Sequence, residues 1–287
     1  MSKYYALIAG LPNISLDDSK ITYSILSFRE ELDSILTSSD KKLVDLFFNK
    51  FDNRNLKSYF AFHDLDPDPR GRISYEAFHD LIQAIQEGEI PKKNKQIPPY
   101  FAEFLSLYLS KQESKEIISW EDRLASLYYA YAMKSSNKIV SQWFELNLNI
   151  NNILAAITCR KFGWDKDSYI VGNNIVAESI RKSNARDFGL SDEVDYLPDL
   201  IRIAEETDLM MREKKIDVLK WNWLEEKVFL IPFDIESVFA YLLKLEMIER
   251  WVTLDKNAGE NTFRSLVKGM KKGSVNALEE FKRNNNK

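Results

Sequence analysis

The sequence predicts an all-α protein made of two or three similar helical subdomains. Apolar residues recur at the 3.6-residue spacing of a buried helix face, for example at Leu146, Ile150, Ile153, Leu154 and Ile157. Only 9 Gly and 8 Pro occur in 287 residues, which disfavours a turn-rich β architecture. Hydrophobic residues make up 45% of the chain and charged residues 29%, as in an ordinary globular protein with an ample core.

The first ninety residues are predicted to form an N-terminal helical subdomain. Residues 3–11 are a strand or a short helix, ended by the turn signal at Pro12. One of Asp17, Asp18 and Ser19 is expected to cap the next helix. The later helices of this part are expected at residues 39–51, 55–62 and 75–87, with a polar break before Asn55.

Residues 88–99 read as a linker, because they combine Gly, Pro and Lys. They separate the first subdomain from a central one at 100–190 and a C-terminal one at 191–287. The last strong helix begins after Asp234 and carries a long apolar stripe that includes Tyr241. Glu249 falls off that stripe and is expected at the surface. A short helix at 261–269 and a polar tail at 271–287 end the chain.

Two segments share a pattern that predicts related helical units. Residues 51–56 (FDNRNL) and 148–153 (LNINNI) both read as apolar, Asp or Asn, any, polar, Asn, aliphatic. Asn is a poor residue for a helix interior, because its amide competes for backbone hydrogen bonds. We therefore expect Asn55 and Asn152 to occupy comparable positions, with chance as the alternative explanation of so short a match.

A resemblance to a known family accompanies this pattern. The stretch 145–163, ELNLNINNILAAITCRKFG, resembles helices of the C subunit of V/A-type rotary ATPases, whose eukaryotic vacuolar counterpart is the d subunit. The segment 235–254, IESVFAYLLKLEMIERWVTL, looks like the last long helix of that family, with Tyr241 followed by Glu246. KYYALIAGLPNISLDDSK and FDNRNLKSYF look closer still to an uncharacterised bacterial branch encoded with such ATPases.

The resemblance implies a non-catalytic component of the central stalk, funnel- or wedge-shaped, which links the rotor shaft to the membrane ring for proton or sodium transport. Its partners would be the shaft and ring subunits, and its place cytoplasmic and peripheral to the inner membrane. The candidate partner-interface residues are Glu246, Glu249, Arg250, Trp251 and Arg160. The chain departs from the family at Asn149, where Asp is frequent, and at Ile248 and Thr253, where an acid and an Arg are common.

One segment resembles a calcium loop. Counting Asp66 as position 1 places Asp68 at position 3 and a glycine at position 6 of an EF-hand-like loop. However, Arg70 stands at position 5, and Ala77 occupies the place of the bidentate Glu. A solvated turn between helices is the better interpretation, and a calcium-responsive protein remains as an alternative.

Nothing in the sequence predicts catalysis, a cofactor or a metal site. Walker, Rossmann and nucleophile-elbow motifs are absent. His63 and His79 are too few for a histidine site, and Cys159 is expected to be a buried thiol. The net charge of -4 gives no case for nucleic-acid binding, and no apolar run approaches the ~20 residues of a membrane span. A helical adaptor or assembly factor without a rotary role is the alternative function.

Overall fold

The computed structural model describes residues 3–61, 66–88, 97–110 and 119–254. Within them every regular element is a helix, so the predicted all-α class is confirmed. The α-helices are α1 (Tyr5–Gly10), α2 (Ile25–Ile35), α3 (Ser38–Ala61), α4 (Tyr75–Gln86), α5 (Pro99–Leu109), α6 (Trp120–Ala132), α7 (Lys138–Phe162), α8 (Ile175–Lys182), α9 (Leu197–Ala204), α10 (Leu209–Val228) and α11 (Ile235–Thr253), with a 3-10 turn at Lys166–Ser168.

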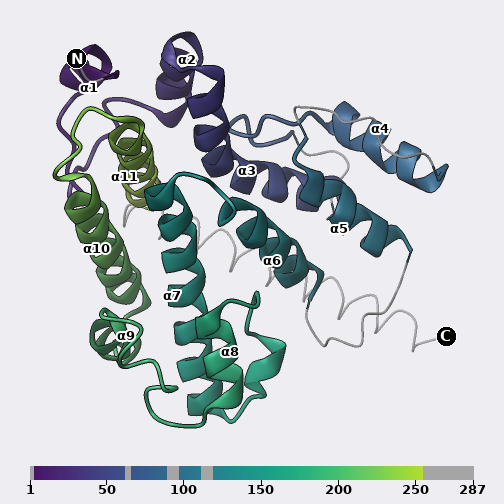
Figure 1. The fold of residues 1–287 in the computed structure, drawn as a ribbon, viewed down its shortest axis with the longest axis vertical. Helices are drawn as coiled ribbons and strands as arrows, with labels where there is room; N and C mark the ends of the chain where they lie inside the picture. The colour runs from purple at the N-terminus through teal and green to yellow at the C-terminus, as the bar shows by residue number, and fades with distance from the viewer. Residues whose placement is uncertain (1–2, 62–65, 89–96, 111–118, 255–287) are drawn as a thin grey trace, which may run out of the picture.

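Helix α7 runs through the middle of the molecule (Figure 1). In that view α10 and α11 lie on one side of it and α6 on the other, while α8 and α9 lie toward its C-terminal end. Helices α2 and α3 lie beyond the opposite end, and α4 and α5 extend away from them. The funnel or wedge form and the division into three subdomains stay predictions.

The boundaries of α7 follow from its terminal residues. Asn137 accepts a hydrogen bond from the N–H of Val140 at 3.1 Å and so caps the first turn. Gly163 ends the helix with φ +68°, a conformation that glycine adopts without steric cost. Between these ends, buried Phe144 and Ile150 pack into the core, and Phe144 lies 6.3 Å from the Phe239 ring of α11.

Three expectations about the helices are wrong. Ser24, rather than residues 17–19, caps α2, because Asp18 turns back to accept from the N–H of Ser15 at 2.8 Å. Helix α3 continues through the expected polar break, since the polar side chains there bond to a neighbouring loop. Glu249 is not at the surface: its side chain is 14% exposed and accepts from the N–H of Ile25 at 2.6 Å.

Helix α11 explains the misplaced glutamate, because it is covered around most of its circumference. Buried residues follow one another from Ser237 to Ala240, and Leu242 and Leu243 are both buried. Tyr241, expected on the buried stripe, is half-buried and donates to the carbonyl of Pro12 at 3.0 Å. A helix so enclosed has no free polar face.

Some expectations fall outside the described residues. These are most of the linker at 88–99, His63, the short helix at 261–269 and the tail at 271–287. None of the helices in the described ranges has the length and apolar character required to cross a bilayer.

Candidate functional site

Two buried asparagines each hold a loop by its main chain. In α3, Asn55 Oδ1 accepts from the N–H of Asp68 at 2.8 Å, and Nδ2 donates to the carbonyl of Asp68 at 3.1 Å. In α7, Asn152 Oδ1 accepts from the N–H of Val171 at 2.9 Å, and Nδ2 donates to the carbonyl of Val171 at 2.8 Å. An amide side chain carries both a donor and an acceptor, so it can satisfy both polar groups of one residue. Asn55 and Asn152 therefore occupy comparable positions inside a helix, as predicted, and they share a bonding pattern that the sequence did not predict.

The residue at the second position of the pattern, Asp52 or Asn149, also bonds to the loop region. Asp52 Oδ1 accepts from the N–H groups of Arg72 at 2.6 Å and Ile73 at 2.9 Å. At the matching place in α7, Asn149 Oδ1 accepts from Asn174 Nδ2 at 2.7 Å. Burial raises the pKa of Asp52 to about 6, although the two N–H groups and Arg29 act against that rise. The first loop therefore holds a titrating carboxylate where the second has a neutral amide.

A glycine stands close to each clamp. A Cβ on Gly71 would overlap the Asn55 amide and lie 3.0 Å from Asp52 Oδ1. Gly172 has φ +76°, and a Cβ there would lie 3.1 Å from Leu148 Cδ2. Both loops thus approach their helix more closely than a larger residue allows.

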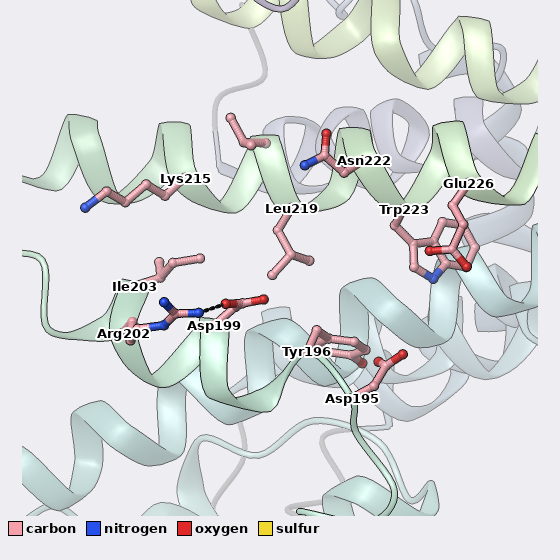
Figure 2. Close-up of a pocket in the computed structure, with 11 residues that line it drawn as sticks. Asp195, Tyr196, Asp199, Arg202, Ile203, Lys215, Leu219, Asn222, Trp223 and Glu226 are labelled. Atoms are coloured by element: carbon pink, nitrogen blue, oxygen red, sulfur yellow. Dashed lines mark hydrogen bonds and ion pairs between the residues drawn. The ribbon is translucent and has the colours of Figure 1, made fainter.

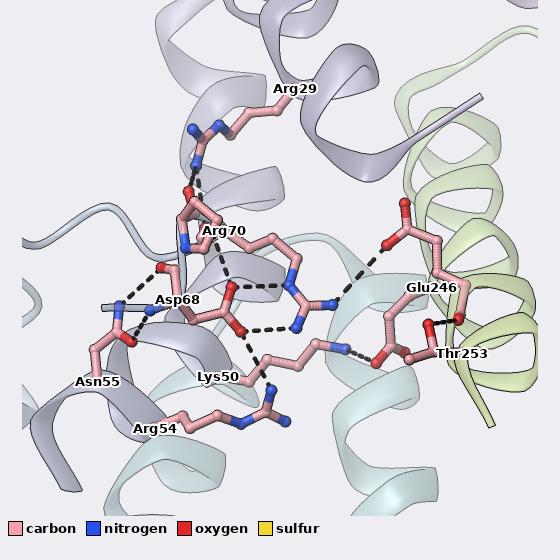
Figure 3. A network of polar contacts seen from close by, with 10 residues as sticks. Arg29, Lys50, Arg54, Asn55, Asp68, Arg70, Glu246 and Thr253 are labelled. Atoms are coloured by element: carbon pink, nitrogen blue, oxygen red, sulfur yellow. Dashed lines mark hydrogen bonds and ion pairs between the residues drawn. The ribbon is translucent and has the colours of Figure 1, made fainter. Parts of the chain in front are cut away.

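Charged side chains link the first loop to α11 (Figure 3). Arg70 donates to Asp68 from Nε at 2.9 Å and from Nη2 at 2.7 Å, and its guanidinium lies 4.3 Å from the centre of the Phe51 ring. Arg70 Nη1 lies 3.9 Å from Glu249 Oε2 of α11. Burial alone would raise the pKa of Asp68, but the hydrogen bonds from Arg70 outweigh burial and lower that pKa. Because Arg70 occupies both Asp68 oxygens, the EF-hand-like segment is built as a salt-bridged turn.

The five predicted interface residues all make contacts within the chain. Glu246 pairs with Lys50 at 2.9 Å, and Arg250 pairs with Asp217. The Trp251 indole donates to the same aspartate at 2.7 Å. Glu249 holds the start of α2, as described above.

Arg160 lies apart from the other four, at the end of α7. It donates to the carbonyls of Ala185 at 2.6 Å and Arg186 at 2.9 Å, and its guanidinium lies 4.1 Å from the centre of the Phe188 ring. The structure thus gives all five residues a role in tertiary contacts. Their contact with a partner protein stays a prediction.

The remaining candidates occupy ordinary structural positions. Cys159 is buried as expected, and burial raises the pKa of its thiol. His79 is exposed, and its Nδ1 lies 3.1 Å from the Tyr59 hydroxyl. Within the described ranges, no three His, Cys, Asp or Glu side chains are grouped so that they could hold a metal ion.

A groove of about 650 Å³ lies between α9 and α10, and the sequence alone did not reveal it (Figure 2). Its apolar floor consists of Tyr196, Ile203, Val218, Leu219 and Trp223. Its charged and polar rim consists of Asp195, Asp199, Arg202, Lys215, Asn222 and Glu226. Val218 is 41% exposed despite its apolar side chain, so this floor is open to solvent.

The structure also exposes three stacked aromatic rings at the C-terminal end of α7. The rings of Phe162 and Trp164 are 5.2 Å apart, and those of Trp164 and Tyr169 are 5.8 Å apart. Their exposed fractions are 58%, 53% and 47%. The signal in the sequence was an aromatic cluster around the helix-ending Gly163, a position where helical periodicity gives no guidance.

The family of the chain follows from a comparison along its length. The family model described as Protein of unknown function (DUF2764) matches residues 1–274. The chain belongs to this family. No curated protein and no solved structure matches the chain.

The DUF2764 match corrects the resemblance to the C subunit of V/A-type ATPases, which is wrong as a family assignment. The segments that suggested it, 145–163 and 235–254, fall in α7 and α11, two of the long helices. Their periodicity reflects burial, and buried amphipathic helices of unrelated families share such periodicity. The amide pattern in α7 is explained by the loop clamps.

Proposed function

We propose that this DUF2764 protein is a non-catalytic helical adaptor that binds another protein in the groove between α9 and α10. The exposed apolar floor of this groove is the observation that carries the proposal. Folding leaves Val218 and Leu219 in contact with water beside the half-buried Trp223 ring. Covering such a floor with apolar side chains of a partner gains hydrophobic free energy, about 25 cal/mol for each Å² removed from water.

The occupant we propose is an amphipathic helix that carries basic residues at one end. Asp195 and Glu226 lie together at one end of the groove, next to Tyr196 and Trp223 (Figure 2). Asp195 forms no ion pair with any described residue, and Glu226 has only Lys227, at 3.6 Å. These acids can therefore pair with incoming Lys or Arg.

The other end of the groove is already neutralised. Lys215 pairs with Glu206 at 2.6 Å, and Arg202 pairs with Asp199. A partner helix therefore finds unpaired charge at one end only, which would fix its direction in the groove. Helix-in-groove recognition commonly combines apolar anchors with flanking charges of this kind.

Crosslinking in living cells tests this proposal. A photoreactive phenylalanine analogue replaces Val218 in the full-length protein, and crosslinked peptides are identified by mass spectrometry. We expect crosslinks to a helical segment with basic residues at one end. The double variant Asp195→Lys, Glu226→Lys should abolish them, whereas Asp192→Lys, an exposed acid outside the groove lining, should leave them intact. Crosslinks that survive the double variant, or none from position 218, would refute the groove as the binding site.

The central-stalk role is a narrower form of the same proposal. It would require the crosslinked peptides to come from the rotor shaft or the membrane ring of an ATPase. The family match gives that role no support, so the adaptor function stands on the groove alone. Co-purification with rotor proteins separates the two.

A further inference from the structure

A second cavity, of about 270 Å³, lies between α3, α6, α7, α10 and α11. Its charged lining consists of three cations and two acids: Lys50, Lys220, Arg250, Asp217 and Glu246. Helix α10 contributes to both sites. Asp217 and Lys220 line the cavity, whereas Val218 and Leu219, which lie between them in the sequence, line the α9–α10 groove. The two sites therefore lie on different faces of one helix.

Both acids of the cavity already have cationic partners. Glu246 accepts from Lys50 Nζ at 2.9 Å. Asp217 pairs with Arg250 and accepts from the Trp251 indole at 2.7 Å. Lys220 forms no hydrogen bond or ion pair with any residue that the structure describes. Arg250 also lies 3.5 Å from Glu213, an acid outside the lining. Lys220 is therefore the cation of the lining that has no direct partner among the described residues.

The surroundings of Lys220 disfavour its charged form. Burial lowers the pKa of its ammonium, Arg250 and Lys50 add repulsion, and Asp217 and Glu246 oppose this only in part. A half-buried ammonium without a direct ion-pair partner is costly, and a bound anion lowers that cost.

We infer that this cavity binds a small oxyanion, inorganic phosphate or a carboxylate, with Lys220 as its principal cation. The volume is several times the ~30 Å³ that one water molecule takes in the liquid. Neutral hydrogen-bonding groups line the same space: the side chains of Asn147, Asn151 and Tyr129. Among the described residues, the Asn151 amide makes only a long contact of 3.4 Å, with the Tyr129 hydroxyl, so it is available to an anion.

Calorimetric titration of the full-length protein with inorganic phosphate, at constant ionic strength set with chloride, tests this inference. Acetate and succinate in separate titrations distinguish a carboxylate from a phosphate site. We expect Lys220→Met to weaken binding about tenfold or more, because a charge-assisted hydrogen bond is lost. The variant should melt at or above the wild-type temperature in the absence of anion, since it removes a half-buried cation that has no direct ion-pair partner among the described residues.

Two further variants make the test specific. Lys215→Met removes a groove lysine that already pairs with Glu206, and it should bind phosphate like the wild type. Asn151→Asp places a negative charge at the cavity from an exposed position and should weaken binding about tenfold without unfolding the protein. No heat with any of the three anions overturns the inference, and so does equal binding by the wild type, Lys220→Met and Asn151→Asp.

Discussion

The two clamped loops share an amide and differ in charge. In both, a mid-helix asparagine binds the N–H and the carbonyl of one loop residue. Around Asn55 the neighbouring side chains are ionisable: Asp52 of α3 accepts from the loop, and Asp68 and Arg70 of the loop pair with each other. Around Asn152 the matching carboxylate is replaced by Asn149, which bonds to another amide. The second loop is therefore positioned without a buried carboxylate, and in the first loop the charges add a connection to α11.

Both loops also have an arginine that donates to their carbonyl groups, Arg29 in the first loop and Arg181 in the second. Arg29 reaches those of Pro69, Arg70 and Gly71, and Arg181 reaches those of Ile170 and Gly172. Only the first loop continues into an acid of a distant helix, through Arg70 and Glu249. We expect the first loop to respond to pH and the second to remain indifferent.

The largest effect is expected from removing either clamp. Asn55→Ala and Asn152→Ala should each lower the free energy of unfolding by about 2–5 kcal/mol, because each leaves a donor and an acceptor without a partner. Urea denaturation measures both. Asn147→Ala is the control: within the part of the chain that the structure describes, its amide bonds only to the carbonyl of Trp143, four residues earlier in α7, so a loss below about 1 kcal/mol is expected. A wild-type midpoint for either clamp variant would contradict their shared role.

Asp52→Asn should make the first loop resemble the second. The Asp52 pKa is about 6 in the folded protein and about 3.9 in the unfolded chain, so the folded state binds the proton more tightly. Between these two values, stability therefore falls as pH rises, by a total of about 3 kcal/mol. The asparagine oxygen can still accept from Arg72 and Ile73 without carrying charge. We expect the variant to exceed the wild type by about 2–3 kcal/mol at pH 8.

The measurement is urea denaturation of the wild type and the variant from pH 4 to pH 8. The two curves should converge near pH 4, where Asp52 is protonated in the folded state. At the matching position of α7 the native residue is already an asparagine, Asn149, so we expect no such pH dependence from the second loop. Parallel curves across the range would mean that Asp52 does not titrate as its burial implies.

Part of this comparison was readable in the sequence. Asn55 and Asn152 stood out because asparagine is unfavourable inside a helix, so its presence in an apolar stripe required a reason. The partner loops did not stand out. Asp68 lies 13 residues after its asparagine and Val171 lies 19 after its own, so no fixed spacing connects clamp and loop.

The candidate sites could not be predicted from the sequence, because they too depend on contacts between distant segments. The groove pairs α9 with α10, and the central cavity gathers side chains from five helices, so both depend on packing. The placement of Glu249 was wrong because a stripe predicts one buried face, whereas α11 is enclosed by α2, α3, α7 and α10. Helical class and periodicity are local properties, and enclosure is a property of the whole fold.

Glu249→Ala tests the connection that only the first loop has. Its carboxylate accepts from the N–H of Ile25 and lies near Arg70, and burial raises its pKa. Removing it leaves the Ile25 N–H without its acceptor, and we expect a loss of about 1–2 kcal/mol. Glu178→Ala in α8, an exposed acid paired with Lys182, should leave the melting temperature close to that of the wild type, because solvent screens the pair. Thermal melting of the two variants side by side provides the measurement, and equal shifts would contradict the burial of Glu249.

The smallest effect is expected at the helix caps that follow the two loops. Ser74 accepts from the N–H of Ala77 at 3.2 Å and caps α4, and Asn174 accepts from the N–H of Ala177 at 3.0 Å and caps α8. Ser and Asn are nearly equal as N-caps, so Ser74→Asn should change stability by less than about 0.5 kcal/mol.

The reverse exchange is not neutral, because Asn174 has a second bond. Its Nδ2 donates to Asn149 Oδ1 at 2.7 Å, and a serine at position 174 is too short to replace the amide in this contact. We expect Asn174→Ser to lose about 1 kcal/mol, the net value of one hydrogen bond. In the double variant Asn149→Ala, Asn174→Ser, the second substitution should add almost nothing, since its partner is already gone. Additive losses in urea denaturation would show that Asn149 and Asn174 act independently, and the second loop would then be held by Asn152 and Arg181 without help from this contact.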